Sequence, residues 1–200
     1  MPRDQAIERS AYYLKYDRWQ DAADTIEHTV KENPGDWQAQ AIYGDALMNL
    51  GELDRAADAL DRALAGNPTD TAIIFELAEV YFRQGNSAAL YQRLRGAGAD
   101  LHSVQAYLLL SDYAQKLNDP DTAVSAARAA IEVDDGVGSP RTAAPYVRAA
   151  ALDALYGNSQ GERKRLRQAY GISPANEQVC ERLRALGEIL GPSLALPPGV

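Results

Sequence analysis

The chain has 200 residues, of which 46% are hydrophobic and 24% are charged, and its formal net charge is −8. Acidic residues outnumber lysine and arginine by 28 to 20, which argues against nucleic acid as the main partner because phosphate binding depends on cations. No apolar run approaches the roughly 20 residues of a bilayer-spanning helix, so we expect no membrane partner either.

Two further features concern the cellular compartment. The single cysteine, Cys180, excludes an intramolecular disulfide framework and fits a reducing environment. The segment Met1–Gln5 lacks the apolar stretch of a secretory signal. Together these features predict a cytoplasmic location.

The first half of the chain contains a sequence repeat with a period of 34 residues. The segment 33–36 (Asn-Pro-Gly-Asp) recurs at 67–70 (Asn-Pro-Thr-Asp), and Ala22 recurs as Ala56. A period of this length is typical of repeat arrays in which each unit is one pair of helices.

The clearest unit predicts a helix over 37–50 and a second helix over 53–66. Asp36 is the expected N-cap and Gly51 the expected turn between the helices. Small side chains at regular positions would let the two helices approach closely.

This unit resembles a tetratricopeptide repeat, whose pattern is W-x2-L-G-x2-Y, then A-x3-F, then a late alanine and a proline. The matching positions hold Gln40, Tyr43, Gly44, Leu47, Ala56, Leu60, Ala63 and Pro68. Only the Trp position departs from the pattern, with Gln40. The resemblance implies an all-α fold, a right-handed α-solenoid of antiparallel helix pairs.

Five such units are predicted, at about 3–36, 37–70, 71–103, 104–138 and 139–174. The first departs from the pattern at Arg9 and Ser10, as a terminal repeat should. The second helix of the third unit is expected to be short and interrupted by Gly96 and Gly98. In the fourth unit Asp119-Pro120 should start the second helix, and an extended loop over 134–142 should precede the fifth unit.

The C-terminal part is predicted to form a capping helix over 175–190, with one apolar stripe. The segment 192–200 is rich in proline and is expected to be a flexible tail or a linker to a further domain. An alternative is that it occupies a groove, either of its own chain or of a neighbour.

Few residues suggest chemistry, and we predict no catalytic site, no cofactor and no metal site. His28 and His102 lie far apart and have no cysteine or acid at ligand spacing. The basic run 163–167 is expected to be a solvated outer face rather than an anion-binding patch, with a capping box over 159–162 at the start of its helix. The chain is therefore not expected to be an enzyme.

The resemblance implies that the first helix of each unit lines a binding groove, with the second, fifth, sixth, ninth, twelfth and thirteenth residues facing inward. The ninth residue is acidic in three consecutive units, and large apolar side chains flank it. We predict that this groove binds a peptide or helix with basic and apolar side chains. The predicted binding residues are Asp45, Met48, Phe75, Glu79, Phe82 and Asp112.

One subtype of the family can be excluded from the residues. Co-chaperone members hold a C-terminal carboxylate with lysine, asparagine and arginine side chains at five positions. The matching positions here are Ile7, Ala11, Ile42, Ala72 and Glu76. None of these is a cation or an amide, and Glu76 would repel a carboxylate.

The sequence therefore predicts a non-enzymatic protein–protein interaction module with a protein or peptide ligand. Two alternatives remain at this stage. One is a structural scaffold that self-assembles into a homo-oligomer. The other is a targeting or regulatory arm of an enzyme whose catalytic domain lies elsewhere in a longer chain.

Overall fold

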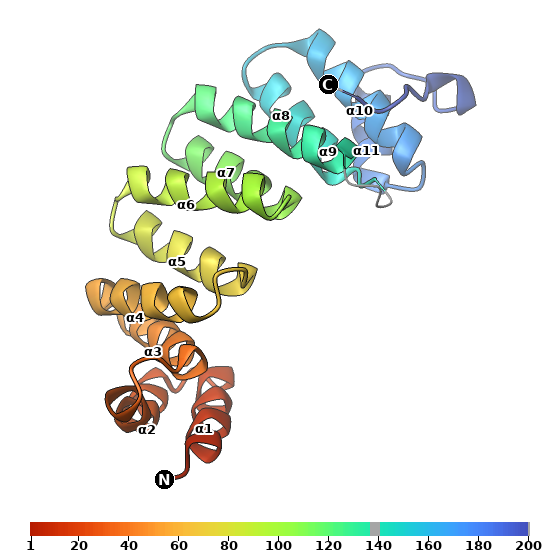
Figure 1. The fold of residues 1–200 in the computed structure, drawn as a ribbon. Helices are drawn as coiled ribbons and strands as arrows, with labels where there is room; N and C mark the ends of the chain where they lie inside the picture. The colour runs from red at the N-terminus through yellow and green to blue at the C-terminus, as the bar shows by residue number, and fades with distance from the viewer. Residues whose placement is uncertain (137–140, 200) are drawn as a thin grey trace. The chain divides into compact units, whose positions relative to one another are not determined.

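The computed structural model describes residues 1–136 and 141–199, and every regular element in these ranges is helical (Figure 1). The helices are α1 (Arg3–Lys15), α2 (Trp19–Glu32), α3 (Trp37–Leu50), α4 (Leu53–Gly66), α5 (Thr71–Arg83), α6 (Ser87–Asp100), α7 (Val104–Lys116), α8 (Pro120–Gly136), α9 (Ala144–Leu155), α10 (Ser159–Ile172), α11 (Glu177–Ala185) and the 3-10 turn η1 (Pro192–Leu194). The chain divides into two compact units, Met1–Leu94 and Arg95–Val200, with the division inside α6. None of the helices in the described residues is long and apolar enough to cross a membrane.

The core of unit 1 is built from consecutive helices that pack in antiparallel pairs. Each of α1 to α4 packs against the next helix, and α3 also contacts α1 and α5. Small side chains make this packing possible: a Cβ on Gly44 would lie 2.6 Å from Cγ of Leu60. Ala56 and Ala63 are also fully buried, which confirms the role predicted for the small residues.

The helix ends in unit 1 follow from local chemistry. The predicted helices over 37–50 and 53–66 coincide with α3 and α4. An Asp36 carboxylate oxygen accepts a hydrogen bond from the Ala39 amide at 3.2 Å, and Gly51 adopts φ +82° in the turn. Asp36 also binds the Arg3 side chain, which ties α1 to the start of α3.

Unit 2 repeats this construction with α7 to α11. The expected start of α8 is confirmed, since Pro120 is its first residue and Asp119 accepts a hydrogen bond from the Thr122 amide at 3.0 Å. Helix α8 continues to Gly136, so the first residues of the loop predicted over 134–142 are helical. Residues 137–140 of that loop lie outside the described range.

The prediction of a short, interrupted helix in the third unit is wrong. Helix α6 continues without a break through Gly96 and Gly98. A Cβ on Gly98 would lie 2.6 Å from the Tyr107 ring, so this glycine allows α6 and α7 to approach instead of ending the helix.

Two predicted boundaries near the C-terminus also need correction. The capping helix α11 is shorter than 175–190, because Asn176 caps its start and Gly187, with φ +81°, ends it. The capping box predicted over 159–162 is absent: Asn158 is the N-cap of α10 and accepts from the Gly161 amide at 3.0 Å, while Glu162 is buried and pairs with Arg182.

The segment 192–199 is not a free tail. Leu194 is only 6% exposed, and the segment lies against α10, where the Leu196 amide donates to the Arg167 carbonyl. Among the alternatives from the sequence, occupation of a groove in the same chain matches the structure.

Candidate peptide-binding surfaces

The predicted binding residues of unit 1 lie on one surface made by α3 and α5, which we call the α3–α5 face. Phe75, Glu79 and Phe82 have the spacing of a single helix face on α5, and all three are half-buried. Asp45 on α3 is half-buried as well and interacts electrostatically with Glu76 of α5. The structure therefore brings Asp45, Phe75, Glu76, Glu79 and Phe82 together.

Met48 is the exception among the predicted residues of unit 1. Its side chain is only 8% exposed, so it belongs to the core and offers little surface to a ligand. Its backbone carbonyl accepts a hydrogen bond from Arg83 at 3.3 Å, which links the end of α3 to α5.

Two carboxyl groups of the α3–α5 face have perturbed acidity. Burial, followed by repulsion from Asp45 and Asp70, raises the pKa of Glu76 to about 7. Burial also raises the pKa of Asp45, against a hydrogen bond from Asn49 that lowers it. Within the described residues the Glu76 carboxylate forms no hydrogen bond or ion pair, whereas Glu79 is paired with Arg83 at 2.6 Å.

Unit 2 contains a groove of about 770 Å³ on the corresponding helices, α7 and α9, and at the start of α11. Gln105, Leu108 and Asp112 line it, so the structure places Asp112 at this groove. However, Asp112 is not available as a lone acid, because the Arg148 guanidinium of α9 lies 3.0 Å from its carboxylate.

Arg148 is held in place by α7. Its Nε donates to the Ser111 hydroxyl at 2.8 Å, and its Nη2 donates to the Ser111 carbonyl at 2.8 Å. The Ser111 hydroxyl in turn donates to the Ala123 carbonyl at 2.9 Å. Burial lowers the pKa of Arg148, which remains charged. Arg148 and Asp112 therefore form a fixed ion pair in the wall of the groove.

Sequence and structure comparisons agree with this helix-pair architecture. Tetratricopeptide repeat models match residues 11–71, 44–102 and 104–136. The chain belongs to the tetratricopeptide repeat (TPR) family. TPR folds are protein–protein interaction modules, and the all-α solenoid class predicted from the sequence is confirmed.

Solved TPR-like structures resemble the chain in fold. The MamA protein has a TM-score of 0.64 at 16% identity, covering 94% of this chain and 97% of its own. YrrB, described as a TPR protein with an unusual peptide-binding site, has a TM-score of 0.58 at 15% identity, with 92% of both chains covered. TTC0263, a TPR protein in Thermus thermophilus, has a TM-score of 0.54 at 18% identity, covering 92% of this chain and 98% of its own. No curated protein sequence matches significantly.

Arg148 was missed by sequence reasoning, although the TPR pattern contains the signal that locates it. Aligning Ala150 with Gly44 places Arg148 at the sixth, inward-facing position of the fifth repeat. The same alignment gives Ala144, Val147 and Ala151 at the second, fifth and ninth positions, and all of them line the groove. Applying the TPR spacing to the fifth repeat would therefore have found this wall.

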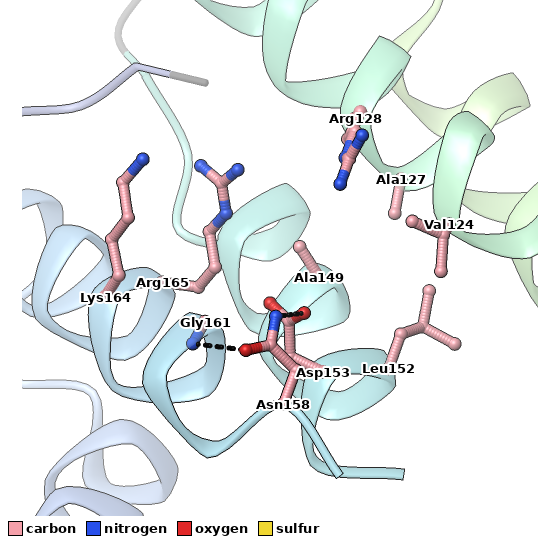
Figure 2. A pocket seen from close by; sticks show the side chains of 10 residues that line it. All are labelled: Val124, Ala127, Arg128, Ala149, Leu152, Asp153, Asn158, Gly161, Lys164 and Arg165. Atoms are coloured by element: carbon pink, nitrogen blue, oxygen red, sulfur yellow. Dashed lines mark hydrogen bonds between the residues drawn. The ribbon is translucent and has the colours of Figure 1, made fainter. Parts of the chain in front are cut away.

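The basic run 163–167 of this TPR chain is only in part the solvated face that we expected, since Arg163 and Lys164 are exposed and the other two arginines are not. Arg165 is only 8% exposed, and Arg167 and Arg163 donate to backbone carbonyls of the C-terminal part of the chain. Lys164 and Arg165 do line a pocket of about 210 Å³ between α8, α9 and α10, with Arg128 on the opposite wall and the Asp153–Asn158 hydrogen bond at its base (Figure 2).

The other residues considered for chemistry have ordinary structural surroundings. Among the described residues no three His, Cys, Asp or Glu side chains are grouped so that they could hold a metal ion. Cys180 is buried, and its thiol donates to the Pro174 carbonyl at 3.3 Å.

Proposed function

We propose that this TPR protein is a non-enzymatic interaction module whose α3–α5 face binds a peptide or helix with basic and apolar side chains. The observation that carries the proposal is the presence of half-buried phenylalanines together with two carboxyl groups that pair with no cation among residues 1–136 and 141–199. Half-buried Phe75 and Phe82 lie on the same helix as Glu76, which interacts with Asp45, and burial raises the pKa of both acids. A lysine or arginine side chain of the ligand would offset the cost of burying the two carboxylates. An apolar side chain of the ligand would cover the phenylalanine rings.

The apolar contacts would supply most of the affinity. Complete burial of a phenylalanine side chain contributes about 1.5–3 kcal/mol, while an exposed ion pair contributes about 0.2–1 kcal/mol. The acids would mainly select ligands by charge and orient them. The fold shared with YrrB, which is described as having a peptide-binding site, supports a peptide as the ligand class.

Unit 2 fits a different role within the proposal. Because Arg148 neutralises Asp112, the groove of unit 2 gives no preference for a basic ligand. The proposal therefore assigns the basic ligand to unit 1, and Asp112, although it faces a groove, is left out of the charge-selective set.

The test uses a labelled amphipathic helical peptide of about 15 residues with leucine and lysine on one face. Fluorescence anisotropy would compare the native chain with Asp45→Asn/Glu76→Gln. We expect the variant to bind roughly ten-fold more weakly, and a peptide with glutamate in place of lysine to bind the native chain more weakly than the lysine peptide does. Affinity of the native chain should rise between about pH 6 and pH 8, because the cation binds the ionised form of Glu76.

The matched control is Asp17→Asn/Asp58→Asn at two exposed positions of unit 1, which changes the net charge equally at about pH 8, where Glu76 is ionised. It should bind the lysine peptide like the native chain. Equal weakening by both pairs of substitutions would mean that net charge alone attracts the peptide, and the α3–α5 face would then lose its role.

A further inference from the structure

The segment 192–199 lies along α10 and is bound there mainly through its backbone. Nε of Arg167 donates to the Leu194 carbonyl at 2.9 Å, and the Leu196 amide donates to the Arg167 carbonyl at 3.2 Å. The Leu194 side chain is buried and provides an apolar anchor.

Further along the segment, two almost completely buried side chains point at its carbonyl groups. Gln168, which is 3% exposed, donates to the carbonyls of Pro197 and Gly199 at 3.0 and 2.9 Å. Arg165, which is 8% exposed, donates to the same Gly199 carbonyl at 2.8 Å and to Oε1 of Gln168 at 3.1 Å. Buried donors of this kind need acceptors, so the site is built to receive a peptide backbone.

The far end of the site is formed by Tyr146 of α9. Its hydroxyl accepts from the Gly199 amide at 3.1 Å and donates to Asp135 at 2.9 Å. The site is also shaped by a missing side chain: a Cβ on Gly171 would lie 2.8 Å from the Leu196 carbonyl oxygen. The absence of a side chain at Gly171 therefore lets the segment approach α10 closely.

The hydrogen-bond pattern determines which positions of the segment can be occupied by proline. The amides of Leu196 and Gly199 are used, whereas positions 197 and 198 contribute no amide because both are proline. Ala195 has φ −59° and ψ 133°, close to a polyproline II conformation. Two prolines keep the segment extended at low entropic cost, and the Pro197 carbonyl faces the buried Gln168 amide of α10.

We propose that α10 carries a peptide-binding site for an extended Leu-x-Leu-Pro-Pro-Gly segment, which this chain fills with its own residues 194–199. The site is separate from the α3–α5 face and does not depend on the proposed function. Because the segment is covalently attached, its effective concentration is in the millimolar range, so it blocks the site against the same sequence in another molecule.

The direct test measures binding of a fluorescein-labelled peptide with the sequence of residues 193–199 to the whole chain. Leu194→Asp places a charge in the apolar anchor position and should release the attached segment without changing the site. We expect the peptide to bind the Leu194→Asp chain at least about 100-fold more tightly than the native chain. Equal binding to both chains, or to neither, would overturn the proposal.

A control peptide with proline in place of Leu196 and leucine in place of Pro197 keeps the composition but loses the required amide. It should bind the Leu194→Asp chain roughly ten-fold more weakly. Equal binding of the two peptides would show that the contact is apolar only and that backbone recognition is absent.

A second measurement does not depend on the folding of the Leu194→Asp chain. Gly171→Ala raises helix propensity but places a methyl group against the Leu196 carbonyl. Hydrogen exchange in the whole chain should show protected Leu196 and Gly199 amides in the native protein and at least about ten-fold faster exchange in the variant. Unchanged exchange at these two amides would overturn the proposal.

Discussion

Glu76 is the residue whose ionisation state connects stability with ligand choice. Its carboxyl group is taken out of water beside Asp45 and Asp70, and its pKa rises to about 7 from an ordinary value of 4.5. Between these two values the folded chain binds more protons at this site than the unfolded chain does. The stability of the fold therefore decreases as the pH rises through this range.

Replacing Glu76 by glutamine should remove this penalty. Since one pKa unit corresponds to about 1.36 kcal/mol, we expect Glu76→Gln to increase the free energy of unfolding by about 1–3 kcal/mol at about pH 8. At about pH 4, where the carboxyl group is neutral in both states, the gain should vanish. Urea denaturation at the two pH values measures the difference. A gain that is independent of pH would show that packing, and not charge, is the cause.

The effect on stability of replacing a glycine within a helix depends on the atoms that surround it. Gly44→Ala would put a Cβ 2.6 Å from Leu60 Cγ, so we expect a loss of about 1–3 kcal/mol from overpacking. Gly96→Ala meets nothing closer than 3.9 Å and should gain about 0.5–1 kcal/mol from helix propensity. Thermal unfolding of the two variants checks this, and the same sign for both would refute the packing argument.

At the scale of elements, Arg148 connects two successive first helices, α7 and α9. It donates to Ser111 and pairs with Asp112, and it is itself partly buried. Removing one partner would therefore leave a partly desolvated charge without its counter-ion, which destabilises the fold.

A double-mutant cycle tests this contact. Arg148→Met should destabilise unit 2 by about 2–4 kcal/mol because Ser111 and Asp112 lose their donor. Asp112→Asn alone should cost less, since the hydrogen bonds to Ser111 remain. We expect a coupling energy of about 0.5–2 kcal/mol between the two positions in urea denaturation. Purely additive losses would show that Asp112 is only a spectator of the Arg148–Ser111 contact.

The comparison of sequence with structure is most instructive for individual elements. The bounds of α3 and α4 could be predicted because Asp36, Gly51 and the small residues act locally. The continuity of α6 could not be predicted from the chemistry of glycine alone, because Gly98 is required by the Tyr107 ring of another helix. A helix breaker and a close-packing position look alike in one sequence.

The residues of the candidate site likewise divide into those whose placement could be predicted from the sequence and those whose placement could not. The inward spacing placed Phe75, Glu79 and Phe82 on one face because helical periodicity is local. It could not show that Met48 is buried or that Asp112 is paired, since both depend on contacts with other helices. The burial of Arg165 depends on residues 197–199, more than 30 positions away, as its 34-residue separation from Gly199 shows. No local pattern reports such a contact.

At the scale of the whole molecule, the net charge of −8 is a property that no single face explains. A negative chain attracts cationic ligands from a distance, and this attraction is screened within about 8 Å at physiological salt. Salt should therefore slow association of a basic peptide while leaving the apolar part of its affinity. The salt dependence of the association rate, compared with that of the affinity, therefore separates long-range steering from recognition on the α3–α5 face.

The division into two compact units makes a final prediction about cooperativity. In repeat proteins the stability of a segment depends on its own helices and on its nearest neighbours. Leu60 is fully buried within unit 1, and Leu60→Ala should cost about 2–5 kcal/mol there. Hydrogen exchange should then show faster opening of α3 and α4 than of α9 and α10, whose protection should change little. Matched losses of protection in both units would mean that the chain unfolds in a single all-or-none step.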